Sequence, residues 1–136
     1  MHNYSKNDVI LVYYPFADLS TSKVRPAIIV STPHISEDVF VVHLTSKVLS
    51  LLPGEFVLTH WADAGLNVTT AVNRGIYTVT SSLIIKKVGN LSTSDAKSLE
   101  NSPPVRLWII ASSLVSQQLL QREKVAPLAE KEPQRV

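Results

Sequence analysis

The chain has 136 residues, 45% of them hydrophobic and 18% charged, which fits one globular domain with a buried core. The formal net charge of +2 permits an anionic partner without requiring one. Cysteine is absent, which excludes disulfides and thiolate metal sites, and the four histidines lack ligand-like spacing, so we expect no metal and no cofactor.

No stretch of the chain approaches the roughly 18 to 20 apolar residues of a membrane-spanning helix. Residues 1–8, MHNYSKND, lack the charged-then-apolar pattern of a secretory signal. We therefore expect a cytoplasmic protein that does not bind a membrane.

Short β-rich runs separated by turn signals fill the first two thirds of the chain. They predict strands over residues 9–14, 25–31, 39–45 and 55–59, with shorter strands near 68–72, 76–80 and 83–87. The run 39–45, VFVVHLT, is almost continuously apolar, so we expect it to be a central strand. Many short strands of this kind favour an antiparallel barrel or a curled sheet.

Helical signals follow the strands. Ser92 or Ser94 can cap a helix over 95–101, and Pro103-Pro104 ends it. From 105 to 121 the apolar residues fall on one helical face, which predicts a second helix.

The domain organisation follows from these elements. We expect one domain over residues 1–121, mostly β with C-terminal helices. Residues 122–136 are charged and contain proline, and we expect them to be disordered.

Arg25 stands where a cation is unusual. It opens the apolar strand 25–31 through an Arg-Pro step. A permanently charged guanidinium at the lip of a buried strand suggests an anionic ligand. Thr45-Ser46-Lys47, at the end of the strand 39–45, adds two hydroxyls and another cation. By contrast, Lys86-Lys87 is interpreted as an ordinary solvated edge.

Four motifs in order carry a family resemblance over roughly residues 7–120. The first is Asn7-Asp8 before an apolar strand, which leads to Arg25–Ser31 (RPAIIVS). The second is Leu44-Thr45-Ser46, the third is Gly65-Leu66 followed by Thr69 or Thr70, and the fourth is the segment 82–92. This pattern resembles the MazF/PemK (Kid) family of toxins from toxin–antitoxin systems. The stretch 70–75 departs from the family pattern, since Arg74 aligns with the family's arginine only through a one-residue gap.

The resemblance implies a small SH3-like antiparallel β-barrel with C-terminal helices, as in MazF-, CcdB- and Kid-type toxins. It implies the toxin component of a type II system, a metal-independent, sequence-preferring endoribonuclease that cleaves single-stranded mRNA. The attacking group would be the substrate 2′-hydroxyl. The resemblance also implies a homodimer with RNA in a groove across the subunits, and a cognate antitoxin protein that occludes Arg25.

Two residues would carry this chemistry. Arg25 can stabilise the phosphorane-like transition state electrostatically, and Thr45 can bond a non-bridging oxygen. Ser46 is a supporting hydroxyl, and His43, in register with Thr45, is a candidate general base.

Candidates for binding the RNA strand lie largely in the loop 15–24, where Lys23 and Ser20 can contact phosphate. Phe16 and Tyr14 can stack a base, and Arg74 is a further candidate.

Structural alternatives stand beside each assignment. Arg25 can form a rim ion pair with Asp18 or Glu55, and Thr45 can be a satisfied strand-end hydroxyl. His43 and the aromatic residues can be ordinary packing. Two functional alternatives also remain open, namely a toxin of the same fold that acts by protein binding (gyrase-poison type) and a degenerate relative that binds only RNA or antitoxin.

Overall fold

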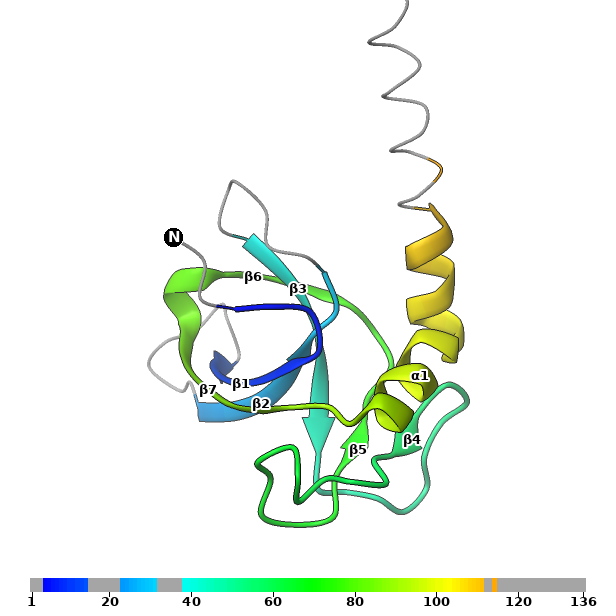
Figure 1. Ribbon diagram of the computed structural model, residues 1–136, viewed down its shortest axis with the longest axis horizontal. Coiled ribbons are helices and arrows are strands. Elements are labelled where there is room, and N and C mark those ends of the chain that lie inside the picture. Colours follow the sequence, from blue (N-terminus) through cyan, green and yellow to red (C-terminus); the bar gives the residue numbers. More distant parts are fainter. Residues whose placement is uncertain (1–3, 15–22, 32–37, 112–113, 115–136) are drawn as a thin grey trace, which may run out of the picture.

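The computed structural model describes residues 4–14, 23–31, 38–111 and 114, and the elements below lie within them (Figure 1). The strands are β1 (Asp8–Tyr14), β2 (Lys23–Ile29), β3 (Asp38–Thr45), β4 (Phe56–Val57), β5 (Ala71–Val72), β6 (Tyr77–Thr80) and β7 (Ile84–Asn90). A 3₁₀ turn, η1 (Ser81–Leu83), links β6 to β7, and helix α1 (Thr93–Asn101) follows. In this part of the chain no helix is long and apolar enough to cross a membrane.

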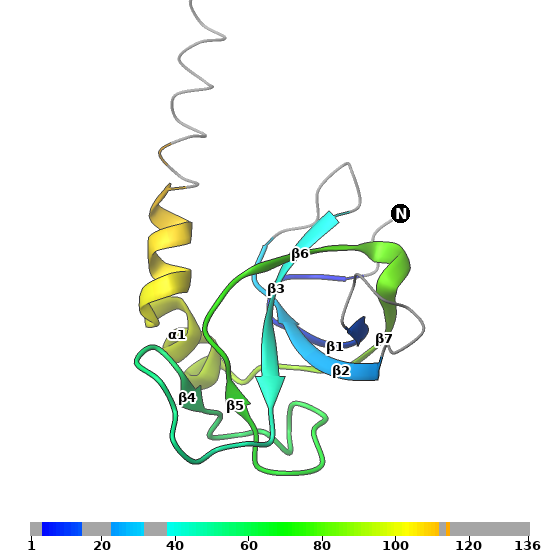
Figure 2. The same ribbon diagram turned by 180° about the vertical axis from the view of Figure 1, so that it is seen from behind.

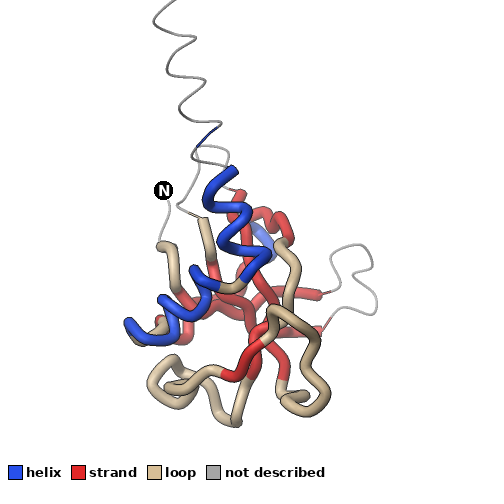
Figure 3. The backbone as a smooth tube through the Cα atoms, turned by 90° about the vertical axis from the view of Figure 1, so that its right-hand side faces the viewer, coloured by secondary structure: helices blue, strands red, loops and turns tan. Residues whose placement is uncertain are grey.

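The strands form one antiparallel sheet in the order β4-β5-β3-β2-β1-β7, with β6 pairing β3 outside that path. The sheet curls, and α1 lies beside β4 and β5 in both views (Figures 1 and 2). Helix α1 and the helical residues after it lie in front of the strands in the view of Figure 3. The expectation of a mostly antiparallel β fold with C-terminal helices is therefore confirmed.

Strand β3 is central, as its continuous apolar run predicts. It pairs with β2, β5 and β6. Successive side chains of the inner strands enter two different core clusters, because neighbours on a strand point to opposite faces. Val9, Ile28 and Val42 belong to the cluster that includes Leu99 of α1, whereas Ile10, Ile29 and Val41 belong to the other.

Asn7 explains why Asn-Asp can open the first strand. Its φ angle is 74°, in the left-handed region that glycine and asparagine adopt most readily. Its backbone N–H donates to the Ile29 carbonyl at 2.7 Å, and its carbonyl accepts from Leu91 N–H at 3.0 Å. Asn7 therefore joins the start of β1 to the last residue of β2 and to the residue that follows β7.

Helix α1 begins as the capping signals indicate. Ser92 is the N-cap, and its hydroxyl accepts from the Asp95 N–H at 3.2 Å. Residues 103–111 and 114 are also helical. The remainder of the predicted helix 105–121 and the tail 122–136 lie outside the described residues.

Two predicted strands are shorter in the structure, and Asp95 explains one of them. The buried Asp95 carboxylate accepts from the N–H groups of Thr59 and His60, both at 2.9 Å. Because a helix side chain takes these two donors, the strand predicted over 55–59 ends at Val57. The strand predicted over 68–72 likewise shrinks to Ala71–Val72, whereas β7 continues to Asn90.

Two glycines allow the turn around residues 61–66 to touch β7 directly. Gly65 has a φ of 91°, and a Cβ there would overlap the Val88 carbonyl oxygen. In return, a Cβ at Gly89 would overlap the Ala64 carbonyl. We call this backbone-to-backbone approach the Gly65–Gly89 contact; it fixes the position of the loop that follows.

The Gly65–Gly89 contact predicts that Gly65→Ala destabilises the fold by about 2 to 5 kcal/mol, the sum of left-handed strain and overpacking. Gly54→Ala is the matched control. Gly54 has nearly the same φ, 90°, but its Cβ would meet proline rings (Pro103 and Pro104) at ordinary distances, the nearest atom at 3.4 Å. We expect Gly54→Ala to cost only about 1 to 2 kcal/mol. Guanidinium unfolding measures both, and equal losses would mean that the contact imposes no constraint.

Candidate functional site

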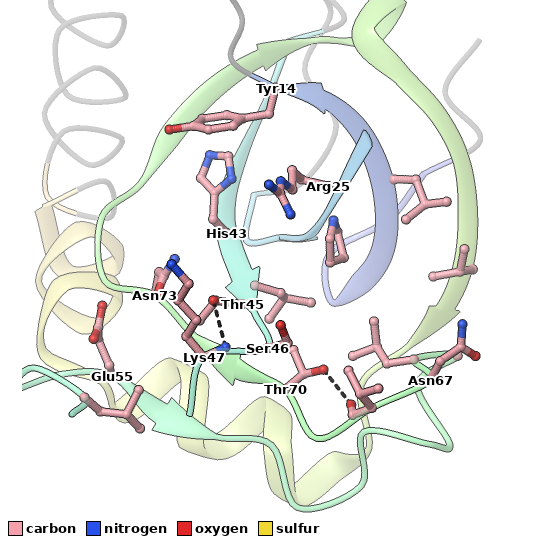
Figure 4. A pocket seen from close by; sticks show the side chains of 18 of the residues that line it. Tyr14, Arg25, His43, Thr45, Ser46, Lys47, Glu55, Asn67, Thr70 and Asn73 are labelled. Carbon is pink, nitrogen blue, oxygen red and sulfur yellow. Dashed lines mark hydrogen bonds between the residues drawn. The ribbon is translucent and has the colours of Figure 1, made fainter. Parts of the chain in front are cut away.

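A groove of about 980 Å³ opens at one end of the sheet. Its walls come from β1, β2, β3 and β7, from the loop after β3 and from the segment 65–70 (Figure 4). Arg25, His43, Thr45 and Ser46 all line this groove, so the structure brings together the four residues proposed for catalysis.

The residues proposed for RNA binding are distributed differently. Tyr14 lines the groove, but Lys23 and Arg74 do not. Arg74 instead donates its backbone N–H to Glu55 Oε2 at 3.2 Å. Ser20 and Phe16 lie outside the described residues.

Arg25 is exposed and lines the groove, and on the neighbouring strand β1 it pairs with Val12. It takes part in no ion pair with another described residue. Glu55, one of the two carboxylates considered as its partner, is engaged elsewhere, since Oε1 accepts from the Leu52 N–H at 2.9 Å. Asp18, the other, is outside the described residues. Among the described residues, therefore, no carboxylate neutralises the guanidinium.

The Thr45 hydroxyl is oriented by its own turn. Lys47 donates its backbone N–H to Thr45 Oγ1 at 3.1 Å (Figure 4). With an acceptor position of the oxygen used in this way, the hydroxyl proton can be donated to a ligand. The expected hydrogen bond from Thr45 to a non-bridging oxygen is chemically possible in this arrangement.

His43 is buried, with 7% of its surface exposed, and lies between two tyrosines. Its ring makes edge-on contacts with Tyr14 (centroids 4.7 Å apart) and with Tyr77 (4.5 Å). Burial lowers the pKa of His43 from its ordinary value, so the neutral imidazole is favoured. This arrangement supports a packing role, in which His43 holds two partly exposed tyrosine rings at the groove.

The charges around the groove favour an anionic ligand. Among the described lining residues, positive charges outnumber negative ones. The cations are Arg25, Lys47 and Lys86, and the one carboxylate is Glu55. Hydrogen bonds from the Leu52 and Arg74 N–H groups lower the pKa of Glu55. Its carboxylate therefore stays ionised and binds these two backbone groups at the edge of the groove. The net effect is an excess of positive charge where a ligand would lie.

Sequence reasoning missed several polar lining residues, among them Tyr77, Asn67, Asn73 and Lys86. Tyr77 lies two residues after Gly75, whose φ is 106°, and a tyrosine this close to a glycine turn was the available signal. The prediction that Lys86-Lys87 forms a solvated edge is confirmed, because both lysines are exposed on β7 at the end of the strand order. The two are not equivalent, since Lys86 lines the groove and Lys87 pairs with Asp8 at 3.2 Å.

Comparison with known proteins defines the class. Residues 5–102 match the model of the PemK-like, MazF-like toxins of type II toxin–antitoxin systems, and the chain belongs to this family. A search of curated proteins finds no match.

Solved structures share the fold at low sequence identity. An endoribonuclease from a mycobacterial species is 21% identical with a TM-score of 0.58, covering 75% of this chain and 88% of that one. A mycobacterial endoribonuclease in complex with its cognate antitoxin is 19% identical (TM-score 0.55, covering 73% and 89%). MazF from Deinococcus radiodurans is 14% identical (TM-score 0.58, covering 75% and 94%).

The burial of His43 predicts that acid destabilises the protein. The unfolded chain protonates His43 near pH 6.5, whereas the folded protein does so only at lower pH. Between these values the unfolded state holds more protons, so the free energy of unfolding falls as the pH drops below about 6.5 and levels off below the folded pKa.

Guanidinium unfolding between about pH 7.5 and about pH 5 tests this expectation. The slope of stability against pH should be shallower in His43→Gln than in the wild type. Identical slopes in His43→Gln and the wild type would contradict the assignment.

Proposed function

We propose that this chain is a metal-independent, sequence-preferring endoribonuclease toxin that cleaves single-stranded mRNA in the cytoplasm. The observation that carries the proposal is the positively charged groove that both Arg25 and the oriented Thr45 hydroxyl line, with Arg25 in no ion pair with another described residue. Membership of the MazF-like family and the fold shared with endoribonucleases support it.

The reaction would be an internal transfer at phosphorus. The 2′-oxygen attacks the adjacent phosphorus, the bond from phosphorus to the 5′-oxygen breaks, and a cyclic phosphate and a 5′-hydroxyl result. One proton leaves the 2′-hydroxyl and one reaches the departing 5′-oxygen. Negative charge on the non-bridging oxygens grows in the transition state, and this is the charge that the groove would stabilise.

Each residue would have a defined role. Arg25 would bond the non-bridging oxygens through its planar guanidinium, as a charge donor rather than a proton donor. Thr45 would donate one hydrogen bond to the same phosphate, and the exposed Ser46 hydroxyl would support it. Tyr14 and Tyr77, 39% and 42% exposed, would offer ring faces for stacking a base, with His43 as their support.

The partners of the proposed toxin follow from the family. We propose a homodimer that binds RNA across its subunits and a cognate antitoxin that covers the Arg25 groove. One solved relative is an endoribonuclease in complex with its cognate antitoxin. The excess of positive charge in the groove suits an acidic partner as well as RNA.

Cleavage of a long single-stranded RNA by purified protein, with EDTA present, tests the proposal. We expect discrete fragments from the wild type. Arg25→Ala should reduce the cleavage rate by about 10²- to 10³-fold, the effect of removing one transition-state donor. Thr45→Ala should reduce it by about 10- to 10²-fold, and Thr45→Ser should restore most of the activity. A 2′-deoxy nucleotide at the cleavage position should block the reaction.

Arg106→Ala is the matched control, because Arg106 bonds Asn101 on the helical side and does not line the groove. It should cleave like the wild type. Intact RNA with folded wild-type protein would overturn the nuclease proposal and favour a toxin that acts by protein binding. Cleavage that survives Arg25→Ala would keep the nuclease and overturn the site.

A further inference from the structure

Lys86 occupies a distinct position in the groove. Leu11 of β1 pairs with Pro26 of β2 on one side and with Lys86 of β7 on the other. All three line the groove. Because neighbouring strands lie about 4.8 Å apart, the backbones at Pro26 and Lys86 are separated by roughly 10 Å. Arg25, next to Pro26, and Lys86 thus lie on the two strands that flank β1, and both side chains line the groove.

The two adjacent lysines of β7 have different roles. Lys87 pairs with the buried Asp8 carboxylate, whose Oδ2 also accepts from the Ser5 N–H at 2.8 Å. Side chains alternate along a strand, so Lys86 points to the other face. Lys86 is exposed and forms no ion pair within the described residues.

Pairing irregularities explain how Lys86 reaches the groove. The register between β1 and β7 shifts between Leu11 and Val12, where Leu11 faces Lys86 but Val12 faces Ile84. A bulge of this kind changes the direction of side chains and increases the local twist. The Lys86 side chain thereby faces the groove at a bulge instead of lying on a regular strand edge.

A polar neighbour stands at the same end of the groove. The Gly65–Gly89 contact places Gly65 against Val88. Asn67 lies two residues after Gly65, and Lys86 lies two residues before Val88. Asn67 is exposed and lines the groove (Figure 4). An amide and an ammonium group thus line the same groove.

Arg25 and Lys86 repel each other unless an anion lies between or beside them. A single phosphate held by Arg25 leaves the ammonium of Lys86 without a counter-charge on the far side of β1. A single strand of RNA carries phosphates at regular intervals, and an extended strand that crosses β1 presents a second phosphate there.

We propose that Lys86 forms a second phosphate-binding subsite, with Asn67 as a neighbouring donor, for a phosphate that flanks the one held by Arg25. This proposal rests on the proposed function, because it assumes that the groove binds RNA. Lys86 acts in binding and in fixing the path of the strand, and it does not take part in the chemical step.

Binding of an uncleavable 2′-O-methyl RNA oligonucleotide, followed by fluorescence anisotropy between about 50 and about 200 mM salt, tests the subsite. Removal of one phosphate contact on a single strand lowers the slope of log K against log salt by about 0.7. Lys86→Gln should show this decrease and bind more weakly at every sequence tested. The control Lys97→Gln, at an exposed lysine on α1, should keep the wild-type slope and affinity.

A scan with single methylphosphonates, which neutralise one phosphate at a time, locates the contact. In the wild type, neutralisation of the flanking phosphate should weaken binding, whereas Lys86→Gln should be insensitive at that position. Equal sensitivity in both proteins would overturn the subsite.

The failures of the two proposals are distinguishable. If the wild type cleaves RNA and Lys86→Gln keeps the full salt slope, only the subsite is wrong. If the wild type neither binds nor cleaves RNA, both proposals fail. Lys87→Gln adds a check on folding, because loss of the Asp8 pair should lower stability while the salt slope of the folded protein stays unchanged.

Discussion

The pairing of β3 on both edges is the constraint on which the rest of the molecule depends. One edge pairs with β2 at residues 41–43, and the other pairs first with β6 and then with β5. Between these two partners the Asn73 N–H donates to the His43 carbonyl at 2.9 Å. A slip of one residue would reverse every side chain of β3 and exchange the residues that fill the two core clusters. In the observed register, Thr45 and His43 reach the groove.

Much of the fold could be predicted from local signals. The apolar runs around Ile28–Ile29 and Val41–Val42 indicate strands buried on both faces, and the structure divides them between two clusters. Ser92 indicates where α1 begins, because a serine at this position caps the N-terminus of a helix. The end of β4 could not be predicted, because it depends on the carboxylate of Asp95, more than thirty positions away, binding two backbone N–H groups.

The site residues that could be predicted are those at the ends of apolar strands. Arg25 and Thr45 stand out because a cation and a hydroxyl cluster flank apolar runs, and the structure brings both to one groove. Whether they catalyse RNA cleavage stays a prediction. Lys86 could not be found in this way, because its position depends on cross-strand register and on a bulge against β1. Two adjacent lysines look equivalent in sequence, yet one neutralises Asp8 and the other faces the groove.

The Gly65–Gly89 contact has a consequence for how such a groove can be redesigned. Two bare backbones touch there, so the height of the loop above β7 is determined by van der Waals radii and not by the size of any side chain. Substitutions at exposed positions just beyond it, such as Asn67 and Val68, alter the chemistry of the groove wall without lifting the loop. Specificity engineering can therefore treat this wall as a stable scaffold with interchangeable contacts, provided that both glycines are retained.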